Sequence, residues 1–447
     1  MRLKTLRLHN FRRFKGARIC EMHSGLTVFA ANNGAGKSSI LDAIALAFGP
    51  FLTRLPKISG NSLVDNDICI QREKDEPFAL VGAETFASRE LKASNSIIDD
   101  SMAWDRIKRL DPSSSIRKTQ DKLAEYGYVV KGHTDINREA DLLITRADSD
   151  EIFPIIAYYG PGRAVLDMPQ RRRGFGKEFP RFHAYADCLN PKTNFRKLFE
   201  YFYFLEDFER REKLETKDFE YQNGQLMAVR RAITDCIPEY QNPRTKLSPL
   251  RFLLDNKMDG DAYDIRLLSD GFKTVIAMVM DIASRMVEAN PDLGATALES
   301  PGIVLIDEIE LHLHPSWQQR IIPDLQRTFP NVQFICTTHS PQVLSTVKQE
   351  SIRVITEEGE IKTGQEMGVN SFGAQSYFIL EDLMKVSPNP RIPEVENLKE
   401  VMKKRLNESE INLGDSDIQR LENMIGARDP FLLNLKAAII KKGKAHA

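Results

Sequence analysis

A glycine-containing loop between an apolar strand and an amphipathic helix constrains the fold of this chain more than any other feature. Residues 26–29 form a short apolar run typical of a buried strand, and the helix expected over residues 39–48 carries apolar side chains on one face. Residues 31–38, Ala-Asn-Asn-Gly-Ala-Gly-Lys-Ser, connect the two. Strand, glycine loop and helix in this order predict a loop whose backbone N–H groups surround a phosphate at the positive end of the helix.

The residue types of this loop suit ATP with Mg²⁺. Lys37 is expected to reach the β- and γ-phosphates, and the Ser38 hydroxyl is expected to coordinate Mg²⁺. Ala31 stands where the motif usually has its first glycine, but one methyl group is a small change that should leave phosphate binding intact. The alternative is a chance glycine turn before a core helix. The residues expected around the nucleotide are Asn33, Gly34, Ala35, Gly36, Lys37, Ser38 and Ser39.

Two acidic residues end a second apolar strand far downstream. Residues 303–306 are apolar without interruption, as expected of a parallel strand covered on both faces, and Asp307 and Glu308 follow directly. A carboxylate at such a strand end can hold the Mg²⁺ shell, so we assign the metal to Asp307. The next carboxylate can polarise the attacking water, which makes Glu308 the candidate general base. The alternative is a pair of acids that only ends a strand.

A histidine follows the next strand-like segment. Residues 332–336 read as a strand that continues into Thr337, Thr338 and His339. A histidine at such a strand end can donate a hydrogen bond to the γ-phosphate, so His339 joins Glu308 as a candidate catalytic residue. Taken alone, His339 would be a structural histidine. Its position as the third element in order favours the functional interpretation.

A serine precedes an apolar helix that is expected over residues 274–286. Ser269 is a natural N-cap, and Asp270 and Gly271 follow it. The simplest interpretation is a helix cap and nothing more. However, a serine and the unpaired N–H groups of a helix N-terminus also form an anion site, which could face the γ-phosphate of ATP on another copy of the chain.

Composition narrows the class of protein. The 447 residues predict two or three domains, and 62 Lys and Arg nearly balance 63 Asp and Glu, so the net charge gives no overall attraction to nucleic acid or membrane. The five cysteines form neither a CxxC pair nor a disulfide framework. Neither a signal peptide nor a membrane-spanning apolar segment is recognised. We therefore expect a cytoplasmic protein with no membrane partner.

Taken together, the phosphate loop, Leu268-Ser-Asp-Gly-Phe272, Asp307-Glu308 and Thr338-His339 resemble the ordered motifs of ABC-type ATPases. The segment Leu268–Phe272 matches the LSGGQ signature except at Asp270 and Phe272. The resemblance implies a head-to-tail homodimer, or a higher homo-oligomer, that holds each ATP between Lys37 of one copy and Ser269 of the other. Residues 10–14, Asn-Phe-Arg-Arg-Phe, and residues 310–315, Glu-Leu-His-Leu-His-Pro, resemble the RecF, SMC and OLD group more than transporter cassettes. In that group the region of Arg12 and Arg13 approaches the nucleotide.

The stretch between the loop and the signature indicates a branch of that group. It has no sustained heptad pattern and no zinc-hook CxxC, so a long SMC-type arm is excluded. Residues 155–163 and 181–190 resemble the ATPase subunits of the Septu anti-phage system, the PtuA family, and related ATPases of retron systems. This resemblance implies an HNH nuclease partner (PtuB-like) that is gated by nucleotide. The alternative is a RecF-like DNA repair ATPase that binds DNA itself, with the basic cluster around Arg171, Arg172 and Arg173 as the candidate contact.

The expected fold class is α/β, an ABC-type ATPase head with a mostly parallel central sheet and N-terminal antiparallel strands. We expect the first half of the head in residues 1–95, a mostly helical insertion in 96–250, the second half of the head in 251–360, and a helical extension in 361–447. The extension carries no nuclease motif, so an ATPase without nuclease activity of its own is predicted. His312 and His314 read as part of a dimer-contact loop or, alternatively, as metal ligands, and Gln71 is a poor candidate for a Q-loop glutamine.

Overall fold

The computed structural model describes residues 1–69, 77–86, 101–113, 115–162, 180–192, 195–384, 392–408 and 411–445. The chain forms two compact units, Met1–Lys385 and Val386–Ala447. The first unit contains the elements that carry the predicted site, and each unit is described by itself below.

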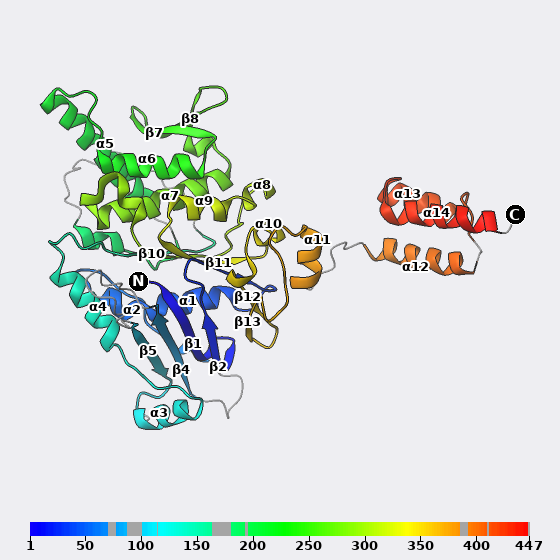
Figure 1. The fold of residues 1–447 in the computed structure, drawn as a ribbon, viewed down its shortest axis with the longest axis horizontal. Helices are drawn as coiled ribbons and strands as arrows, with labels where there is room; N and C mark the ends of the chain where they lie inside the picture. The colour runs from blue at the N-terminus through cyan, green and yellow to red at the C-terminus, as the bar shows by residue number, and fades with distance from the viewer. Residues whose placement is uncertain are drawn as a thin grey trace, which may run out of the picture. The chain divides into compact units, whose positions relative to one another are not determined.

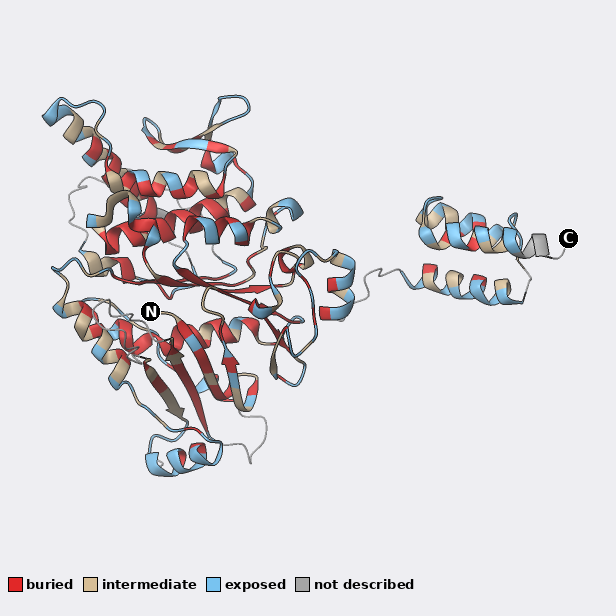
Figure 2. Ribbon diagram, viewed as in Figure 1, coloured by how far each residue is buried: buried red, intermediate tan, exposed pale blue. Residues whose placement is uncertain are grey.

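A six-stranded, mostly parallel sheet forms the centre of the first unit (Figure 1). Its strand order is β13-β12-β3-β11-β10-β6, and every neighbouring pair is parallel except β12 with β13. Every residue of β3, β6, β10 and β11 is buried (Figure 2), because both faces of the sheet are covered. The strands are β3 (Leu26–Ala30), β6 (Ile155–Tyr159), β10 (Gly302–Ile306), β11 (Val332–Thr338), β12 (Ile352–Ile355) and β13 (Ile361–Thr363).

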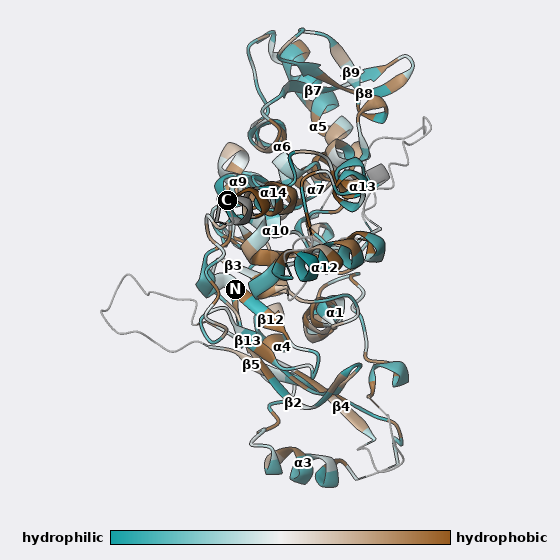
Figure 3. Ribbon diagram, turned by 90° about the vertical axis from the view of Figure 1, so that its right-hand side faces the viewer, coloured by the Kyte–Doolittle hydropathy of each residue, from teal (hydrophilic) through white to brown (hydrophobic). Residues whose placement is uncertain are grey.

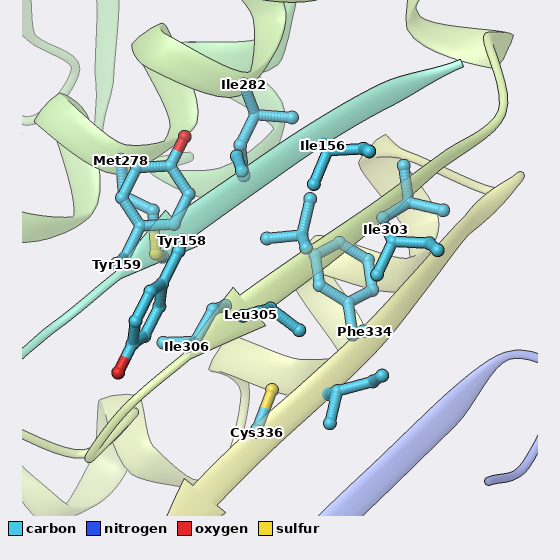
Figure 4. Close-up of a cluster of buried hydrophobic side chains, with 14 of the residues drawn as sticks. Ile156, Tyr158, Tyr159, Met278, Ile282, Ile303, Leu305, Ile306, Phe334 and Cys336 are labelled. Atoms are coloured by element: carbon cyan, nitrogen blue, oxygen red, sulfur yellow. The ribbon is translucent and has the colours of Figure 1, made fainter. Parts of the chain in front are cut away.

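Helices pack on the two faces of this sheet (Figure 1). On one face lies α1 (Lys37–Ala47), which follows the glycine loop. On the other lies α7 (Asp270–Ala289), with α6 (Gly224–Cys236) and α9 (Ile321–Thr328) around it. The apolar residues of α7, including Met278 and Ile282, face β6 in the buried core (Figure 4). The predicted helix after Ser269 is therefore a central element of the core.

A second sheet, which is antiparallel throughout, lies beside α1 and has the order β2-β1-β4-β5. Its strands are β1 (Leu3–Phe11), β2 (Phe14–Glu21), β4 (Phe78–Thr85) and β5 (Ala103–Arg109). The side chain of Gln333 on β11 joins the two sheets: its Nε2 donates to Leu3 O at 2.7 Å and its Oε1 accepts from Leu3 N at 2.7 Å. The expected α/β head, with a mostly parallel central sheet and N-terminal antiparallel strands, is confirmed.

The range 96–250, expected to be a mostly helical insertion, contributes strands to both sheets of the head. β5 forms an edge of the antiparallel sheet, and β6 forms an edge of the central sheet. Strand pairing depends on partners far away in the sequence, which local periodicity does not reveal. Helices of this range are α3 (Ile116–Glu125), which is mostly hydrophilic (Figure 3), α4 (Thr134–Thr145), α5 (Phe195–Thr216) and α6. A third, antiparallel sheet contains β7 (Tyr240–Leu247), β8 (Leu250–Asn256) and β9 (Ala262–Asp264).

Short helical segments complete the first unit. In the part of the chain that the structure describes, no helix is both long and apolar enough to cross a membrane. The short elements are α2 (Gly49–Arg54), η1 (Asp65–Asp67), η2 (Arg181–Tyr185), η3 (Ile265–Leu267), η4 (Pro291–Glu299), α8 (Pro315–Gln318), α10 (Pro341–Leu344), η5 (Gln349–Ser351), α11 (Ser376–Phe378) and η6 (Ile379–Leu383).

The second unit is helical, as expected of the C-terminal extension, but it begins later than residue 361. The reason is that β13 (Ile361–Thr363) still pairs with β12 and therefore belongs to the head. The unit consists of α12 (Pro393–Asn407), α13 (Ser416–Ile425) and α14 (Pro430–Ala445). Its helices share a small apolar core of their own: Val395, Met402, Ile418, Leu421, Leu432 and Leu435.

Candidate nucleotide-binding site

The strand register brings the predicted motifs to one edge of the central sheet. Thr338 at the end of β11 pairs with Ala30 at the end of β3, and Cys336 pairs with Ile306 at the end of β10. Because carboxyl ends of parallel strands meet at the same edge, the glycine loop, His339 and the two acids lie next to one another. These segments are far apart in the sequence and meet only through the fold.

The loop after β3 has the backbone conformation that its glycines allow. Gly34 and Gly36 both have positive φ, at 73° and 97°, a region that favours glycine. Gly36 is also tightly packed, since a Cβ there would lie 2.7 Å from Arg13 Cδ and 2.9 Å from Phe14 Cζ. Ala31, in contrast, is buried and has no positive φ, so an alanine fits where the usual motif has glycine.

The amino group of Lys37 lies against the loop that precedes it. Nζ donates to Ala31 O at 2.9 Å and to Asn32 O at 3.1 Å, and it lies 3.5 Å from His339 Nδ1. Burial lowers the pKa of Lys37, although Asp307, Glu310 and Glu308 act in the opposite direction. The ammonium group is therefore held by two neutral carbonyls in a position where an anionic phosphate would be a stronger partner.

The remaining loop residues surround the start of α1. Asn33 and Ser38 are exposed, Ser39 is half-buried, and Ala35 is buried. The first N–H groups of a helix have no acceptor within the helix, and no acidic side chain occupies the first turn of α1. An exposed hydroxyl and unpaired N–H groups at the positive end of a helix are suited to a phosphate with its metal ion.

One threonine fixes both acids at the end of β10. The Thr337 hydroxyl donates to Asp307 Oδ1 at 2.5 Å and accepts from the Glu308 N–H at 2.8 Å. Asp307 is only 2% exposed, whereas Glu308 is half-buried. Glu308 also has φ of 47°, in the left-handed region that a non-glycine residue rarely adopts. The chain therefore turns sharply between the two carboxylates, and Thr337 is a site residue that the sequence analysis missed.

Glu310 is a second residue that the sequence analysis did not assign to the site. Its carboxylate accepts from the Thr338 hydroxyl at 2.7 Å and from the backbone N–H of His339 at 2.5 Å. Burial, followed by the nearby Lys37, lowers the pKa of His339, so the imidazole is neutral at pH 7. Glu310 fixes the backbone at His339, and the neutral imidazole keeps one N–H that can donate a hydrogen bond.

The two N-terminal arginines have different positions. Arg13 donates to Gly34 O and thus lies on the glycine loop, which places it with the predicted nucleotide residues. Arg12 pairs with Asp42 on α1 and, at 2.9 Å, with Asp67. Arg12 has two carboxylate partners, so it is held at the helix that follows the loop and not at the loop itself.

A tyrosine on β6 also reaches α1. β6 pairs with β10 on the side away from β11, and the Tyr158 hydroxyl donates to Asp42 Oδ1 at 2.8 Å. The signal for this contact in the sequence is weak, since it consists of an aromatic residue at the end of an apolar run. Gln71, the poor candidate for a Q-loop glutamine, lies outside the described residues.

The predicted signature residues form the start of α7. Ser269 and Asp270 are exposed, and the Ser269 hydroxyl makes no cap hydrogen bond to the helix. Gly271 packs against the loop after the acids, since a Cβ there would lie 2.5 Å from His312 O. A 20-residue helix therefore presents a solvent-facing N-terminus beside the loop that follows Glu308.

The remaining candidates are the basic cluster and His314. Arg171, Arg172 and Arg173 lie outside the described residues. His314 accepts a hydrogen bond from the Ser316 N–H at the start of α8, which is a capping contact. Within the described ranges, no group of three or more His, Cys, Asp or Glu side chains is arranged to hold a metal ion.

The glycine loop follows β3, the two acids follow β10, and the histidine follows β11. This arrangement at one edge of a parallel sheet defines an ATPase head of the ABC type. The chain belongs to the family described as "AAA domain, putative AbiEii toxin, Type IV TA system", whose sequence model matches residues 32–345. It is 28% identical over 450 residues to the retron Ec83 probable ATPase of Escherichia coli, covering 87% of this chain and 77% of that protein. It is 29% identical over 192 residues to the Septu protein PtuA of Bacillus thuringiensis, covering 42% and 48%.

Among solved structures, a crystal structure of an SMC head bound to the C-winged helix domain of ScpA covers 81% of this chain and 97% of that chain. The TM-score is 0.47 and the sequence identity is 16%, which is a remote likeness.

Proposed function

We propose that this protein binds Mg-ATP and hydrolyses it at composite sites shared by two copies arranged head to tail. One copy would supply the glycine loop, Asp307, Glu308 and His339, and the other would supply Ser269 at the start of α7. The observation that carries this proposal is the solvent-facing N-terminus of α7, where Ser269 and Asp270 are exposed and the Ser269 hydroxyl makes no cap contact. The N–H groups at such a helix end can bind an anion.

Each residue has a role that its position supports. Lys37 would exchange its two carbonyl partners for the β- and γ-phosphates, and neutral His339 would donate to the γ-phosphate. Glu308 is half-buried and follows the metal carboxylate directly, as a base for the attacking water requires. ATP turnover at this site would depend on the second copy of the chain closing over the bound nucleotide.

Mg²⁺ fits the oxygen donors at this edge. The exposed Ser38 hydroxyl and the Asp307 carboxylate are the hard oxygen ligands that Mg²⁺ prefers, together with phosphate oxygens and water. When bound, Mg²⁺ would neutralise charge on the phosphates. Thr337 holds Asp307 through one carboxylate oxygen, Oδ1, and thereby orients the other.

The proposed biological role is nucleotide-dependent control of a nuclease in anti-phage defence. The support is the likeness to a retron probable ATPase and to the Septu protein PtuA. By the same resemblance, the partner would be an HNH nuclease, and the C-terminal unit is the candidate docking surface. A RecF-like repair ATPase would instead bind DNA strongly by itself.

The site proposal is tested with three variants. Glu308→Gln should bind ATP normally, lose turnover by orders of magnitude and accumulate as an ATP-bound dimer in analytical ultracentrifugation. In that background Ser269→Arg should abolish the dimer while each chain still binds ATP, and Lys37→Ala should abolish both. A Ser269→Arg, Glu308→Gln protein that still dimerises with ATP would refute the composite site.

The role is tested separately. Purification of the protein from its native operon should recover a small nuclease, and nuclease activity of the complex should change with ATP. Strong, salt-sensitive binding of duplex DNA by the chain alone would favour the repair alternative.

A further inference from the structure

Two adjacent tyrosines at the end of β6 point to opposite faces of the central sheet (Figure 4). Both are buried, and each hydroxyl donates one hydrogen bond to an aspartate on a helix. Tyr158 contacts Asp42 on α1, the helix that follows the glycine loop. Tyr159 contacts Asp281 on α7, the helix that begins with the signature residues. The same strand therefore contacts both helices that would carry ATP-binding motifs.

Tyr159 joins the metal-binding end of β10 to α7. Its carbonyl accepts from the Asp307 N–H at 2.8 Å, and its hydroxyl donates to Asp281 Oδ2 at 2.6 Å. Burial, followed by the charge of Asp281, raises the pKa of Tyr159 well above its ordinary range, so the hydroxyl keeps its proton and remains a donor. A single residue thus holds the backbone of Asp307 and a side chain of α7.

Arg285 makes the Asp281 contact difficult to rearrange. Arg285 Nε donates to Asp281 Oδ2 at 2.8 Å, and Nη1 donates to Ala184 O at 2.6 Å and to Ala186 O at 3.1 Å. Asp281 is only 7% exposed, and its pair with Arg285 lies within α7 and moves with it. A shift of α7 would instead break the hydrogen bond from Tyr159 to Asp281 and those from Arg285 to Ala184 O and Ala186 O. The network therefore fixes how far α7 is rotated and how far it slides along its axis.

Ser269 lies about three helical turns from Asp281 on the same rigid helix, since an α-helix has about 3.6 residues per turn. A rotation or translation of α7 at Asp281 is therefore passed on to Ser269 and Gly271. Tyr158 acts on a different helix. Asp42 lies on α1, between Tyr158 and Arg12, close behind Lys37.

We propose that the Tyr159 hydroxyl is a positioning group for the ATP bound by the other copy of the chain, acting through Asp281 on the signature end of α7. Its neighbour Tyr158 serves the ATP of its own chain, acting through Asp42 on α1. This inference rests on the composite site proposed above. Neither hydroxyl touches the nucleotide, so both are positioning residues and not catalytic ones.

Mixed dimers distinguish the two roles. Tyr159→Phe and Tyr158→Phe each remove one hydroxyl and leave the ring, so they form a matched pair. Each variant, carrying one affinity tag, is combined with Lys37→Ala or Ser269→Arg carrying a second tag, and doubly purified heterodimers are assayed for ATP turnover. In every such heterodimer at most one of the two composite sites is complete, and the proposal decides in which pairings one is.

The expected patterns are opposite. As a homodimer, Tyr159→Phe should lose about tenfold in turnover, of the order expected for losing a hydrogen bond to a buried carboxylate, while ATP affinity of the single chain is unchanged. Paired with Lys37→Ala, it should regain one working site, because its own ATP then meets an intact signature from the other chain. Paired with Ser269→Arg, it should regain none. Tyr158→Phe should be restored by Ser269→Arg and not by Lys37→Ala.

Three outcomes would overturn the inference: turnover of Tyr159→Phe within twofold of wild type, restoration by Ser269→Arg in place of Lys37→Ala, or equal loss in both pairings, which indicates general damage to the fold. The heterodimer of Lys37→Ala with Ser269→Arg is the reference. If that reference shows no turnover, the composite site itself is wrong and the failure lies in the proposed function. If it is active, the outcome concerns Tyr159 alone.

Discussion

Thr337→Val tests whether one hydroxyl holds the acidic end of β10 in place. Valine keeps the size and branching of threonine, so the substitution removes two hydrogen bonds with little change in packing. The bond to the buried carboxylate of Asp307 is of the kind worth about 1.5–3 kcal/mol, and an unpaired, partly buried N–H at Glu308 adds about 1 kcal/mol. We therefore expect unfolding of the head to become easier by about 3 kcal/mol.

Turnover should fall as well. Glu308 is held at φ of 47°, and the left-handed region costs a non-glycine residue about 1–2 kcal/mol. Without the contact from Thr337, the backbone can relax and move the Glu308 carboxylate away from the loop, so we expect at least about a tenfold loss of turnover, as for a misplaced catalytic group.

The assay combines urea unfolding, followed by tryptophan fluorescence, with steady-state ATP turnover. Thr337→Ser is the matched control, because it keeps both hydrogen bonds and loses only a methyl group, worth about 1 kcal/mol. The serine variant should stay close to wild type in turnover. If the valine variant is as stable and as active as the serine variant, the assigned bridging role of Thr337 is incorrect.

Two further predictions concern the loop and its histidine. Gly36→Ala should abolish ATP binding in calorimetry, because its Cβ would lie 2.7 Å from Arg13 Cδ, whereas Gly34→Ala, where nothing lies within 4 Å, should weaken binding much less; equal effects would contradict the packing argument. Burial lowers the pKa of His339, so the folded state binds fewer protons than the unfolded state, and stability should fall as the pH drops below about 6.5. His339→Gln should remove this part of the decline in melting temperature between pH 7.5 and 5; an unchanged slope would count against it.

The sequence predicted the central strands well because their signal is local. The runs at 26–29, 303–306 and 332–336 correspond to β3, β10 and β11, each with the expected polar motif at its carboxyl end. The register then explains why the motifs meet: parallel strands place their carboxyl ends at a common edge. Local patterns were sufficient for this part, and the ABC-type head is confirmed.

What the sequence did not predict depends on non-local contacts. Thr337 and Glu310 were visible in the motifs, but their roles depend on hydrogen bonds between neighbouring strand ends. The assignment of β6 to the central sheet depends on pairing with β10, and nothing in residues 155–159 identifies that partner. Arg12 was grouped with Arg13, although its carboxylate partners, Asp42 and Asp67, come from separate segments.

The alternation of side chains along a strand explains the role of β6 in the proposed dimer. Neighbouring side chains of a strand point to opposite faces, so one step along the sequence separates a contact to α1 from a contact to α7. β6 pairs with β10 and ends level with it, so β6 contacts both helices and its Tyr159 carbonyl accepts from the N–H of Asp307, the proposed metal ligand. A change that slipped the register of β6 by one residue would turn each tyrosine to the opposite face of the sheet and disturb both contacts at once. Coordination of the two ATP sites would then depend on strand register as much as on the residues that touch ATP.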